Sequence, residues 1–286
     1  MALIGLLVSV RENGGEPFRE NIMSLEHTID QLRTLKLTGM VAGVEHQLAQ
    51  SSYGALGFDQ RLGHLVDAEV SQRDSKRFTR LIRNAKLKVY AEPEAIDYRV
   101  GRGLDRSVIA DLLTCGWIEH RQNVLVTGQT GTGKTWLACA LAVQAARQGI
   151  TVGYRRVGRL LEDMEVGHAD GSLAKLRNQL ARTGLLILDD FGLTPLSSRG
   201  RADLLELLDD RVGSGATIVA GQMPVQDWHA FIHDPALADA IMDRLIHSSH
   251  KRRRQPSPGS ECWRRCPALL ALASNSFGGG VQFRRR

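Results

Sequence analysis

Hydrophobic positions divide the chain into a helical N-terminal part and a longer part in which short apolar runs alternate with helices. From Met23, apolar residues recur every three or four positions, which predicts an amphipathic helix or helix pair. Residues 62–87 predict a second, highly charged helix, and residues 91–122 predict short helices. No such period holds before Met23, so we expect residues 1–22 to be a weakly ordered extension.

From Asn123 onward, four apolar runs resemble buried strands. The runs cover residues 124–127, 150–157, 185–190 and 217–220, and helical patterns follow them near 136–147, 160–161, 202–212 and 236–246. Strands that are apolar on both faces and alternate with helices predict a parallel sheet covered by helices. We therefore expect an α/β domain over residues 101–250, behind an α-helical N-terminal domain over residues 23–100.

The net charge of +6 first favours a nucleic-acid partner, but its location weakens that argument. Residues 251–286 hold nine Lys or Arg and one acidic residue, so residues 1–250 carry a net charge of −2. The same segment mixes charge runs with Pro, Gly and Ser, and one short apolar patch, ALLALA. We expect residues 251–286 to be basic and disordered, without an element that packs on the sheet.

Composition also limits the location of the protein. No apolar run reaches the roughly 18 to 20 residues that a membrane span needs, so no membrane partner is expected. Four Cys in a chain of 286 residues do not form a disulfide framework. Both observations favour the cytoplasm.

The clearest chemical signal is the octapeptide Gly-Gln-Thr-Gly-Thr-Gly-Lys-Thr between a predicted strand and a predicted helix. Glycines let successive backbone N–H groups point inward at phosphate oxygens, and the helix N-terminus adds its positive dipole end. Lys134 is expected to reach the β- and γ-phosphates, and the Thr135 hydroxyl to ligate Mg²⁺. The predicted phosphate-binding residues are Gly128, Gln129, Thr130, Gly131, Thr132, Gly133, Lys134 and Thr135. This pattern is a P-loop, which predicts ATP and Mg²⁺ as cofactors.

Other polar residues follow later strands of the predicted sheet. Asp189 and Asp190 end the run LLILDD, where strand ends face the ligand crevice, so Asp189 is placed for Mg²⁺ and Asp190 for the attacking water. Gln222 follows TIVAG and is either near the γ-phosphate or an ordinary loop residue. Arg244 lies among acidic residues, and its spacing alone favours a surface ion pair.

Three segments together resemble the IstB-like ATP-binding proteins, helper ATPases encoded with the transposase in one group of bacterial insertion sequences. The segments are GQTGTGKTWLACALAVQAARQG, LLILDDFGLTPL and TIVAGQMPVQDWHAFIHDPALADAIMDRLIHSSH. The family is in turn similar to the DnaC helicase loaders and the initiator DnaA. The resemblance extends from Met23 to about His250, which also makes Met23 a candidate start.

The resemblance implies a P-loop ATPase of the AAA+ class that self-assembles on double-stranded DNA and delivers a transposase to it. It identifies the octapeptide as Walker A, Asp189 and Asp190 as Walker B, and Gln222 as a residue near sensor one. It also implies that Arg244 reaches the ATP of a neighbouring subunit.

The chain departs from this family in two places. Ala220-Gly221-Gln222 stands where the family usually has Thr-Ser-Gln, so two hydroxyls are missing beside sensor one. After His250, the expected last strand and second sensor arginine are replaced by KRRRQPSPGSECWRRC. We interpret the sequence after His250 as a frameshifted or divergent C-terminus that removes the last strand. Such a change would put both ATP hydrolysis and assembly in doubt.

A run of basic residues precedes the α/β domain. We call it the basic stripe; it comprises Arg73, Lys76, Arg77, Arg80, Arg83, Lys86 and Lys88. Most of these positions keep the three- and four-residue spacing of one helix face, which suits sequence-tolerant contact with DNA phosphates. A solvated helix face is an equal alternative from the residues alone, and the family resemblance favours DNA.

The sequence therefore predicts an ATP-dependent DNA-binding helper of a transposase. Two alternatives remain open at this point: a DnaC-like helicase loader of the same fold, and a DNA-binding remnant that binds ATP without hydrolysing it.

Overall fold

The structure is a computed structural model that describes residues 17–98, 104–247 and 268–272. The chain divides into two compact units, Met1–Arg77 and Phe78–Arg286. The division falls inside helix α3 (Phe58–Ala85), whereas the sequence pattern places it near residue 100. The difference has a packing cause, because Leu81 and Ala85 near the end of α3 are buried in the same core as the strands.

The first unit contains α1 (Pro17–Thr34), α2 (Thr38–Ala49), a 3₁₀ turn (Ser51–Ala55) and the first part of α3. Helix α1 begins at Pro17, six residues before the periodic pattern that starts at Met23. Proline suits the first helical position because its missing N–H would have no intrahelical partner there. The rest of the predicted N-terminal extension lies outside the described residues.

Helix α2 packs against α3 through a glycine and a buried carboxylate. A Cβ atom built on Gly39 would lie 2.5 Å from Cα of Glu69, so only glycine permits this approach. Oε2 of Glu69 accepts hydrogen bonds from the backbone N–H groups of Gly39 at 2.7 Å and Met40 at 3.2 Å. These are amides that the first turn of a helix leaves without an intrahelical partner. Glu69 therefore caps α2 from the neighbouring helix.

The second unit contains a sheet of parallel strands in the order β2-β3-β4-β1-β5. The strands are β1 (Val124–Gly128), β2 (Val152–Arg156), β3 (Leu185–Phe191), β4 (Ala216–Gly221) and β5 (Ala268–Leu272). The first four of these confirm the four strands that the apolar runs predict. The parallel α/β fold with a helical N-terminal region is thereby confirmed.

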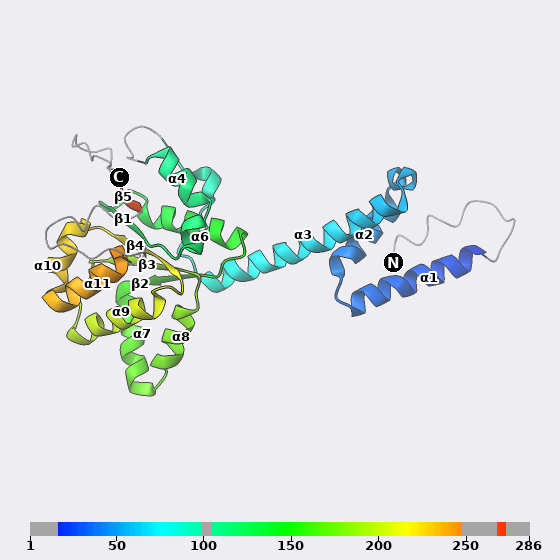
Figure 1. Ribbon diagram of the computed structural model, residues 1–286. Coiled ribbons are helices and arrows are strands. Elements are labelled where there is room, and N and C mark those ends of the chain that lie inside the picture. The colour runs from blue at the N-terminus through cyan, green and yellow to red at the C-terminus, as the bar shows by residue number, and fades with distance from the viewer. Residues whose placement is uncertain (1–16, 99–103, 248–267, 273–286) are drawn as a thin grey trace. The chain divides into compact units, whose positions relative to one another are not determined.

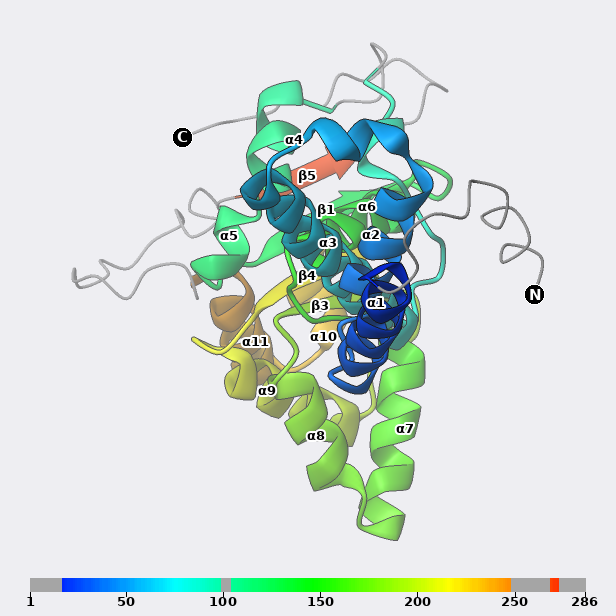
Figure 2. The same ribbon diagram turned by 90° about the vertical axis from the view of Figure 1, so that its right-hand side faces the viewer.

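Helices cover both faces of this sheet (Figures 1 and 2). Alternate residues of one strand point to opposite layers: Val124 and Val126 pack toward α6, whereas Leu125 packs toward α9 and α11. The helices of this unit are α4 (Arg106–Leu113), α5 (Gly116–Glu119), α6 (Lys134–Arg147), α7 (Val157–Asp170), α8 (Leu173–Ala181), α9 (Ser198–Arg211), α10 (Trp228–Ile232) and α11 (Pro235–His247). Short 3₁₀ turns lie at Pro93–Ala95 and Val225–Asp227.

The last strand is present, which corrects the interpretation that the altered C-terminus removes it. Residues 268–272, from the apolar patch ALLALA, form β5 and pair in parallel with β1, with Val124 opposite Ala268 and Gly128 opposite Leu272. The expectation that residues 251–286 contain no element of the sheet is wrong for this segment. Residues 248–267 and 273–286, including the basic run after His250, lie outside the described residues.

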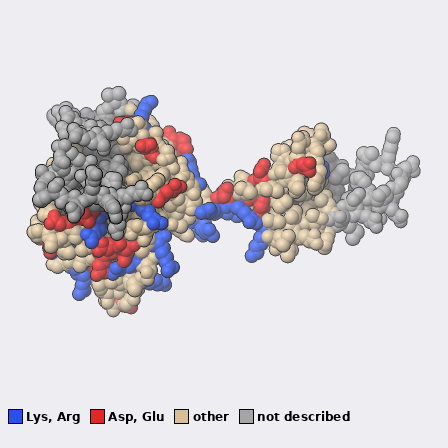
Figure 3. Space-filling model, viewed as in Figure 1, with Lys and Arg blue, Asp and Glu red and all other residues tan. Residues whose placement is uncertain are grey.

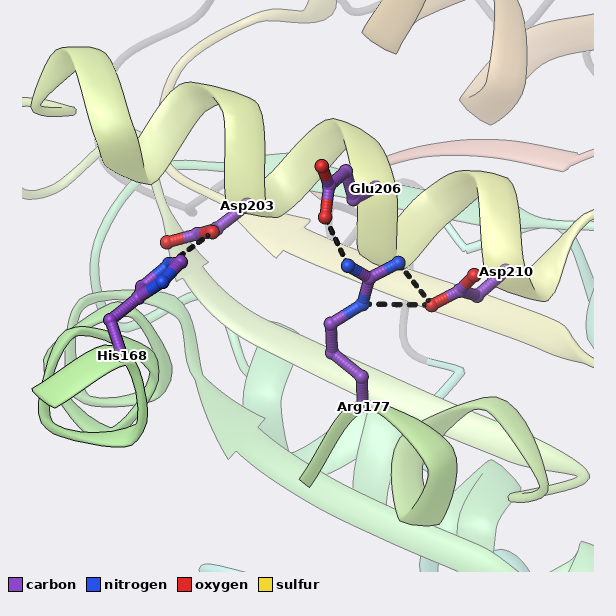
Figure 4. A network of polar contacts seen from close by, with 5 residues as sticks. All are labelled: His168, Arg177, Asp203, Glu206 and Asp210. Atoms are coloured by element: carbon purple, nitrogen blue, oxygen red, sulfur yellow. Dashed lines mark hydrogen bonds and ion pairs between the residues drawn. The ribbon is translucent and has the colours of Figure 1, made fainter. Parts of the chain in front are cut away.

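Polar contacts tie the α7–α8 hairpin to α9 (Figure 4). Arg177 on α8 donates to Oδ2 of Asp210 from Nε at 3.0 Å and from Nη2 at 2.8 Å, and its Nη1 pairs with Glu206. Nε2 of His168 on α7 lies 2.9 Å from Oδ1 of Asp203, a buried carboxylate. Because α9 carries the acidic partners of both helices, the hairpin is held on one side of the sheet.

Candidate nucleotide-binding site

The loop of residues 128–133, which we call the phosphate loop, connects β1 directly to α6. Gly131 has φ +83° and Gly133 has φ +91°, a conformation that side chains with a Cβ rarely adopt. No heavy atom lies within 4 Å of a Cβ atom built on either glycine, so the backbone is open to a ligand. The strand, the loop and the helix N-terminus thus have the arrangement that binds a phosphate chain.

Side chains of the loop and the first turn of α6 surround this opening. Nζ of Lys134 donates to the carbonyl oxygen of Gln129 at 2.7 Å, so the lysine folds over the loop. Thr132 Oγ1 donates to the same carbonyl at 2.8 Å. Burial lowers the pKa of Lys134, and the nearby charges of Asp189 and Asp190 oppose this effect. The ammonium group therefore lies over the loop, where the charges of both acidic side chains act on it.

Asp189 lies beside Thr135, as the sequence predicts for a shared metal site. Thr135 Oγ1 donates to Oδ2 of Asp189 at 2.8 Å, and Asp189 is 2% exposed. The pairing of β3 with β4 shifts register between Leu188 and Phe191, so both carboxylates lie at an irregularity of the strand. A hydroxyl and a carboxylate are the hard oxygen ligands that Mg²⁺ prefers, so these residues fit that ion. The open loop fits the phosphates of a nucleotide.

Asp190 has an unusual backbone and a basic partner. Its φ is +59°, the left-handed region that few non-glycine residues occupy and that is enriched at functional sites. Nε of Arg156 donates to Oδ2 of Asp190 at 2.8 Å. The Asp190 side chain is 22% exposed, so it is accessible to water near the phosphate loop.

Gln222, which follows β4, contacts the phosphate loop. Thr130 Oγ1 donates to Oε1 of Gln222 at 2.9 Å, so the residue predicted to lie near the γ-phosphate is beside the loop. It comes directly after Gly221, the partner of Thr127 in the β1–β4 register. The structure therefore brings Lys134, Asp189, Asp190 and Gln222 together.

Arg244 lies at the other end of the sheet from the phosphate loop. Its main-chain carbonyl accepts from Nδ2 of Asn123, which immediately precedes β1, whereas the loop follows β1. The guanidinium pairs with Asp209 through Nε at 2.6 Å and with Asp243 at 3.4 Å. Arg244 is therefore not part of the site in its own chain.

The basic stripe lies mainly on α3, where Lys and Arg side chains gather (Figure 3). All seven residues are exposed. Two of them bind groups of their own unit: Nε of Arg73 donates to Oε1 of Glu69 at 2.6 Å, and Nζ of Lys76 donates to Thr38 Oγ1 at 2.8 Å. The Arg73 hydrogen bond is the main cause that lowers the pKa of Glu69. Arg73 thus has a structural role in addition to any role with DNA.

Strand β2 contributes two contacts to the site that sequence reasoning missed. Tyr154 donates its hydroxyl to Oδ2 of Asp189 at 2.7 Å, and Arg156 pairs with Asp190. Burial, and then the hydrogen bond to Asp189, raise the pKa of Tyr154. Their signal in the sequence is weak, because it consists only of alternate polar positions near the end of a strand. Their partners are set by the pairing of β2 with β3.

A parallel sheet with this strand order, a phosphate loop after β1, which lies between β4 and β5, and two acidic residues on β3 define a P-loop protein of the AAA+ class. The chain belongs to the IstB-like ATP-binding protein family, whose sequence profile matches residues 30–256. The resemblance drawn from the sequence is thereby confirmed.

Individual relatives agree with this assignment. The chain is 48% identical over 204 residues to a protein of Pseudomonas fluorescens named as the ATP-binding protein of insertion sequence IS1162, covering 71% of this chain and 88% of that protein. It is 42% identical over 224 residues to an insertion sequence ATP-binding protein of Sinorhizobium fredii, covering 78% and 91%. The structure resembles that of DnaI with a TM-score of 0.50 and 16% identity, covering 64% of this chain and 91% of that chain.

None of the described helices is long and apolar enough to cross a membrane.

Proposed function

We propose that this protein binds ATP with Mg²⁺, hydrolyses it, and acts as a DNA-binding helper of the transposase of its insertion sequence. The observation that carries the proposal is the contact between Thr135 and Asp189 beside the phosphate loop, at 2.8 Å. It joins the two oxygen ligands that Mg²⁺·ATP requires, one from the first turn of α6 and the other from β3. The names of the relatives as insertion sequence ATP-binding proteins support the same nucleotide and the same genetic setting.

Each polar residue of the site has a role in this proposal. Backbone amides of residues 128–133 and the Lys134 ammonium hold the phosphates, and Thr135 and Asp189 hold Mg²⁺. The Asp190 carboxylate orients and deprotonates the attacking water, and Gln222 contacts the γ-phosphate. Arg244 stabilises negative charge on the phosphates bound by a neighbouring subunit, which is why it lies away from its own loop. This role requires self-association.

The DNA contact in this proposal is the basic stripe. Its residues are exposed, and most project from one continuous helix, so they neutralise phosphates without reading bases. Double-stranded DNA is the partner, and delivery of the transposase to that DNA is the biological output.

The presence of β5 favours an active enzyme over the hydrolysis-deficient remnant. That alternative rested on the altered C-terminal part of the module, including loss of the last strand, and β5 pairs with the strand that leads into the phosphate loop. Family membership favours a transposase partner over a replicative helicase. A pull-down of the purified chain with each partner separates the two, and binding only to the helicase would support the loader alternative.

The test of the enzymatic part is DNA-stimulated ATP hydrolysis by the full chain. The wild type is expected to turn over ATP faster with duplex DNA. Lys134→Ala is expected to lose nucleotide binding, and Asp190→Asn to bind nucleotide but lose hydrolysis by about a hundredfold or more. Asp227→Asn, at an exposed carboxylate outside the site, is the matched control. A wild type that binds ATP without any DNA-dependent turnover would support the remnant instead.

A further inference from the structure

One oxygen of Asp189 is shared by two hydroxyl donors from different elements. Oδ2 accepts from Thr135 Oγ1 at 2.8 Å and from the Tyr154 hydroxyl at 2.7 Å. Thr135 comes from α6, which follows the phosphate loop, and Tyr154 comes from β2, which pairs with β3. The candidate metal-binding carboxylate is therefore held from two sides.

Shape alone does not explain a tyrosine at position 154. The side chain is 7% exposed and packs in the core between the sheet and α6, beside Val152, Cys139 and Ile187. A phenylalanine ring would fill the same space without a hydroxyl that needs a partner. In this core the hydroxyl has one partner atom among the described contacts, and that atom belongs to Asp189.

The two hydroxyl donors differ in whether they can also bind the metal ion. An almost fully buried carboxylate needs hydrogen-bond donors in place of water. The Thr135 oxygen is also a candidate ligand for Mg²⁺, so the bound ion would determine the orientation of this hydroxyl. The Tyr154 hydroxyl is not a candidate ligand for the ion, and the tyrosine ring is packed in the core. It is the donor that keeps the carboxylate plane in place when the ion and nucleotide bind.

We infer that Tyr154 is a positioning residue for Mg²⁺, acting through Asp189; the inference rests on the proposed ATP·Mg²⁺ binding. Groups that orient metal-binding side chains commonly change metal affinity by about 10- to 100-fold when removed. Tyr154→Phe should therefore raise the Mg²⁺ concentration needed for half-maximal binding of a non-hydrolysable ATP analogue by about tenfold. Affinity for the same analogue in EDTA should stay unchanged, since the phosphate loop itself is untouched.

The test measures binding of a fluorescent non-hydrolysable ATP analogue to the full chain while Mg²⁺ is titrated. In an Asp189→Asn background, Tyr154→Phe should have no further effect, because the two residues act as one unit. Tyr53→Phe, at another tyrosine in the first unit, is the matched control. An unchanged Mg²⁺ requirement, or an equal loss of affinity with Mg²⁺ and in EDTA, would overturn the inference.

A second measurement leaves Tyr154 intact and so does not depend on how Tyr154→Phe folds. The chain has four tyrosines, and changing Tyr53, Tyr90 and Tyr98 to Phe leaves Tyr154 alone. With 3-fluorotyrosine incorporated, its ¹⁹F signal should shift when Mg²⁺ is added to the nucleotide complex, and no shift would overturn the inference. If wild type binds no nucleotide and matches Lys134→Ala, the proposed function fails instead, so the two failures are distinguishable.

Discussion

Arg244 on α11 donates from Nε to Oδ1 of Asp209 on α9, and the two atoms lie 2.6 Å apart. The Arg244 side chain is still 34% exposed, so the pair lies at the surface of its unit. An arginine in this position can be presented to a second subunit while its own carboxylates fix its direction. The pair therefore makes the proposed role of Arg244 between subunits testable.

Arg244→Ala should leave nucleotide affinity unchanged and lower DNA-stimulated hydrolysis by about a thousandfold or more, since arginines supplied to phosphoryl transfer have effects of that order. Arg159→Ala, which removes surface ion pairs with Glu162 and Asp163, is the control. Mixing Arg244→Ala with Asp190→Asn should restore part of the activity. At a mixed interface, the Asp190→Asn protein supplies an intact Arg244 to the site of the Arg244→Ala protein, which retains Asp190. Absence of any recovery would argue against action between subunits.

Arg156→Gln should release Asp190 from its ion pair and raise ATP hydrolysis in the absence of DNA. The effect should be small, because Arg156 is 57% exposed and ion pairs of exposed side chains are weak. Steady-state kinetics with and without DNA provide the measurement. Nucleotide affinity should not change, and Arg155→Gln on the same strand is the control. A fall in basal hydrolysis would show that Arg156 supports Asp190 in catalysis.

Reversing Arg77, Arg80 and Arg83 to Glu should weaken DNA binding without altering nucleotide affinity. Arg73 is left unchanged, because its hydrogen bond to Glu69 stabilises the first unit. In a salt titration, the plot of log affinity against log salt should become less steep, by the amount that corresponds to about three lost phosphate contacts. The same reversal at Arg121, Lys175 and Arg182 controls for net charge. DNA affinity that is equal in the two triple variants would exclude a specific role for the basic stripe.

The capping carboxylate Glu69 should make the first unit sensitive to acid. The Arg73 hydrogen bond lowers the pKa of Glu69, and burial opposes this less strongly. A carboxyl with a lowered folded-state pKa stabilises the fold above its unfolded-state pKa, and this contribution is lost as the pH falls through the folded-state pKa. The protection of the Gly39 and Met40 amides against hydrogen exchange, taken relative to the intrinsic rate at each pH, should therefore fall in acid. In Glu69→Gln this protection should already be lower at neutral pH and should depend less on acid.

The pairing of β5 with β1 can be tested with two neighbouring proline substitutions. Successive N–H groups of a strand point to opposite sides, so of Leu269→Pro and Leu270→Pro one removes a donor that faces β1 and the other a donor on the outer side. One variant should lose about 1 to 3 kcal/mol and several degrees in Tm, and the other should lose less. Thermal melting of both variants provides the measurement. If both variants melted at the same temperature as the wild type, the result would contradict the pairing of β5 with β1.

The parts of the fold with strong local patterns were predictable from the sequence. Residues 185–188 are apolar without interruption because β3 is buried on both faces, and the strand was predicted with its two acids. The phosphate loop was predictable because its glycines are required by backbone conformation, which is a local property.

The features that the sequence pattern missed depend on distant partners. Tyr154 meets Asp189 only because β2 pairs with β3, and no spacing along the chain records that register. Strand β5 is five residues long and lies among charged, glycine-rich and proline-rich sequence, so its apolar run resembles an isolated patch until β1 is considered. Helix α1 extends past the region of clear periodicity to Pro17.

The position of β1 between β4 and β5 has a consequence for biosynthesis. The phosphate loop emerges from the ribosome early relative to β5, so the strand that leads into it first pairs on one side only. Its second neighbour becomes available only after residue 272 has been added, and pairing between segments so far apart in the chain forms slowly. A nascent chain should therefore acquire its full affinity for nucleotide only after translation has passed β5, so that the proposed nucleotide-dependent assembly would follow folding of the protomer.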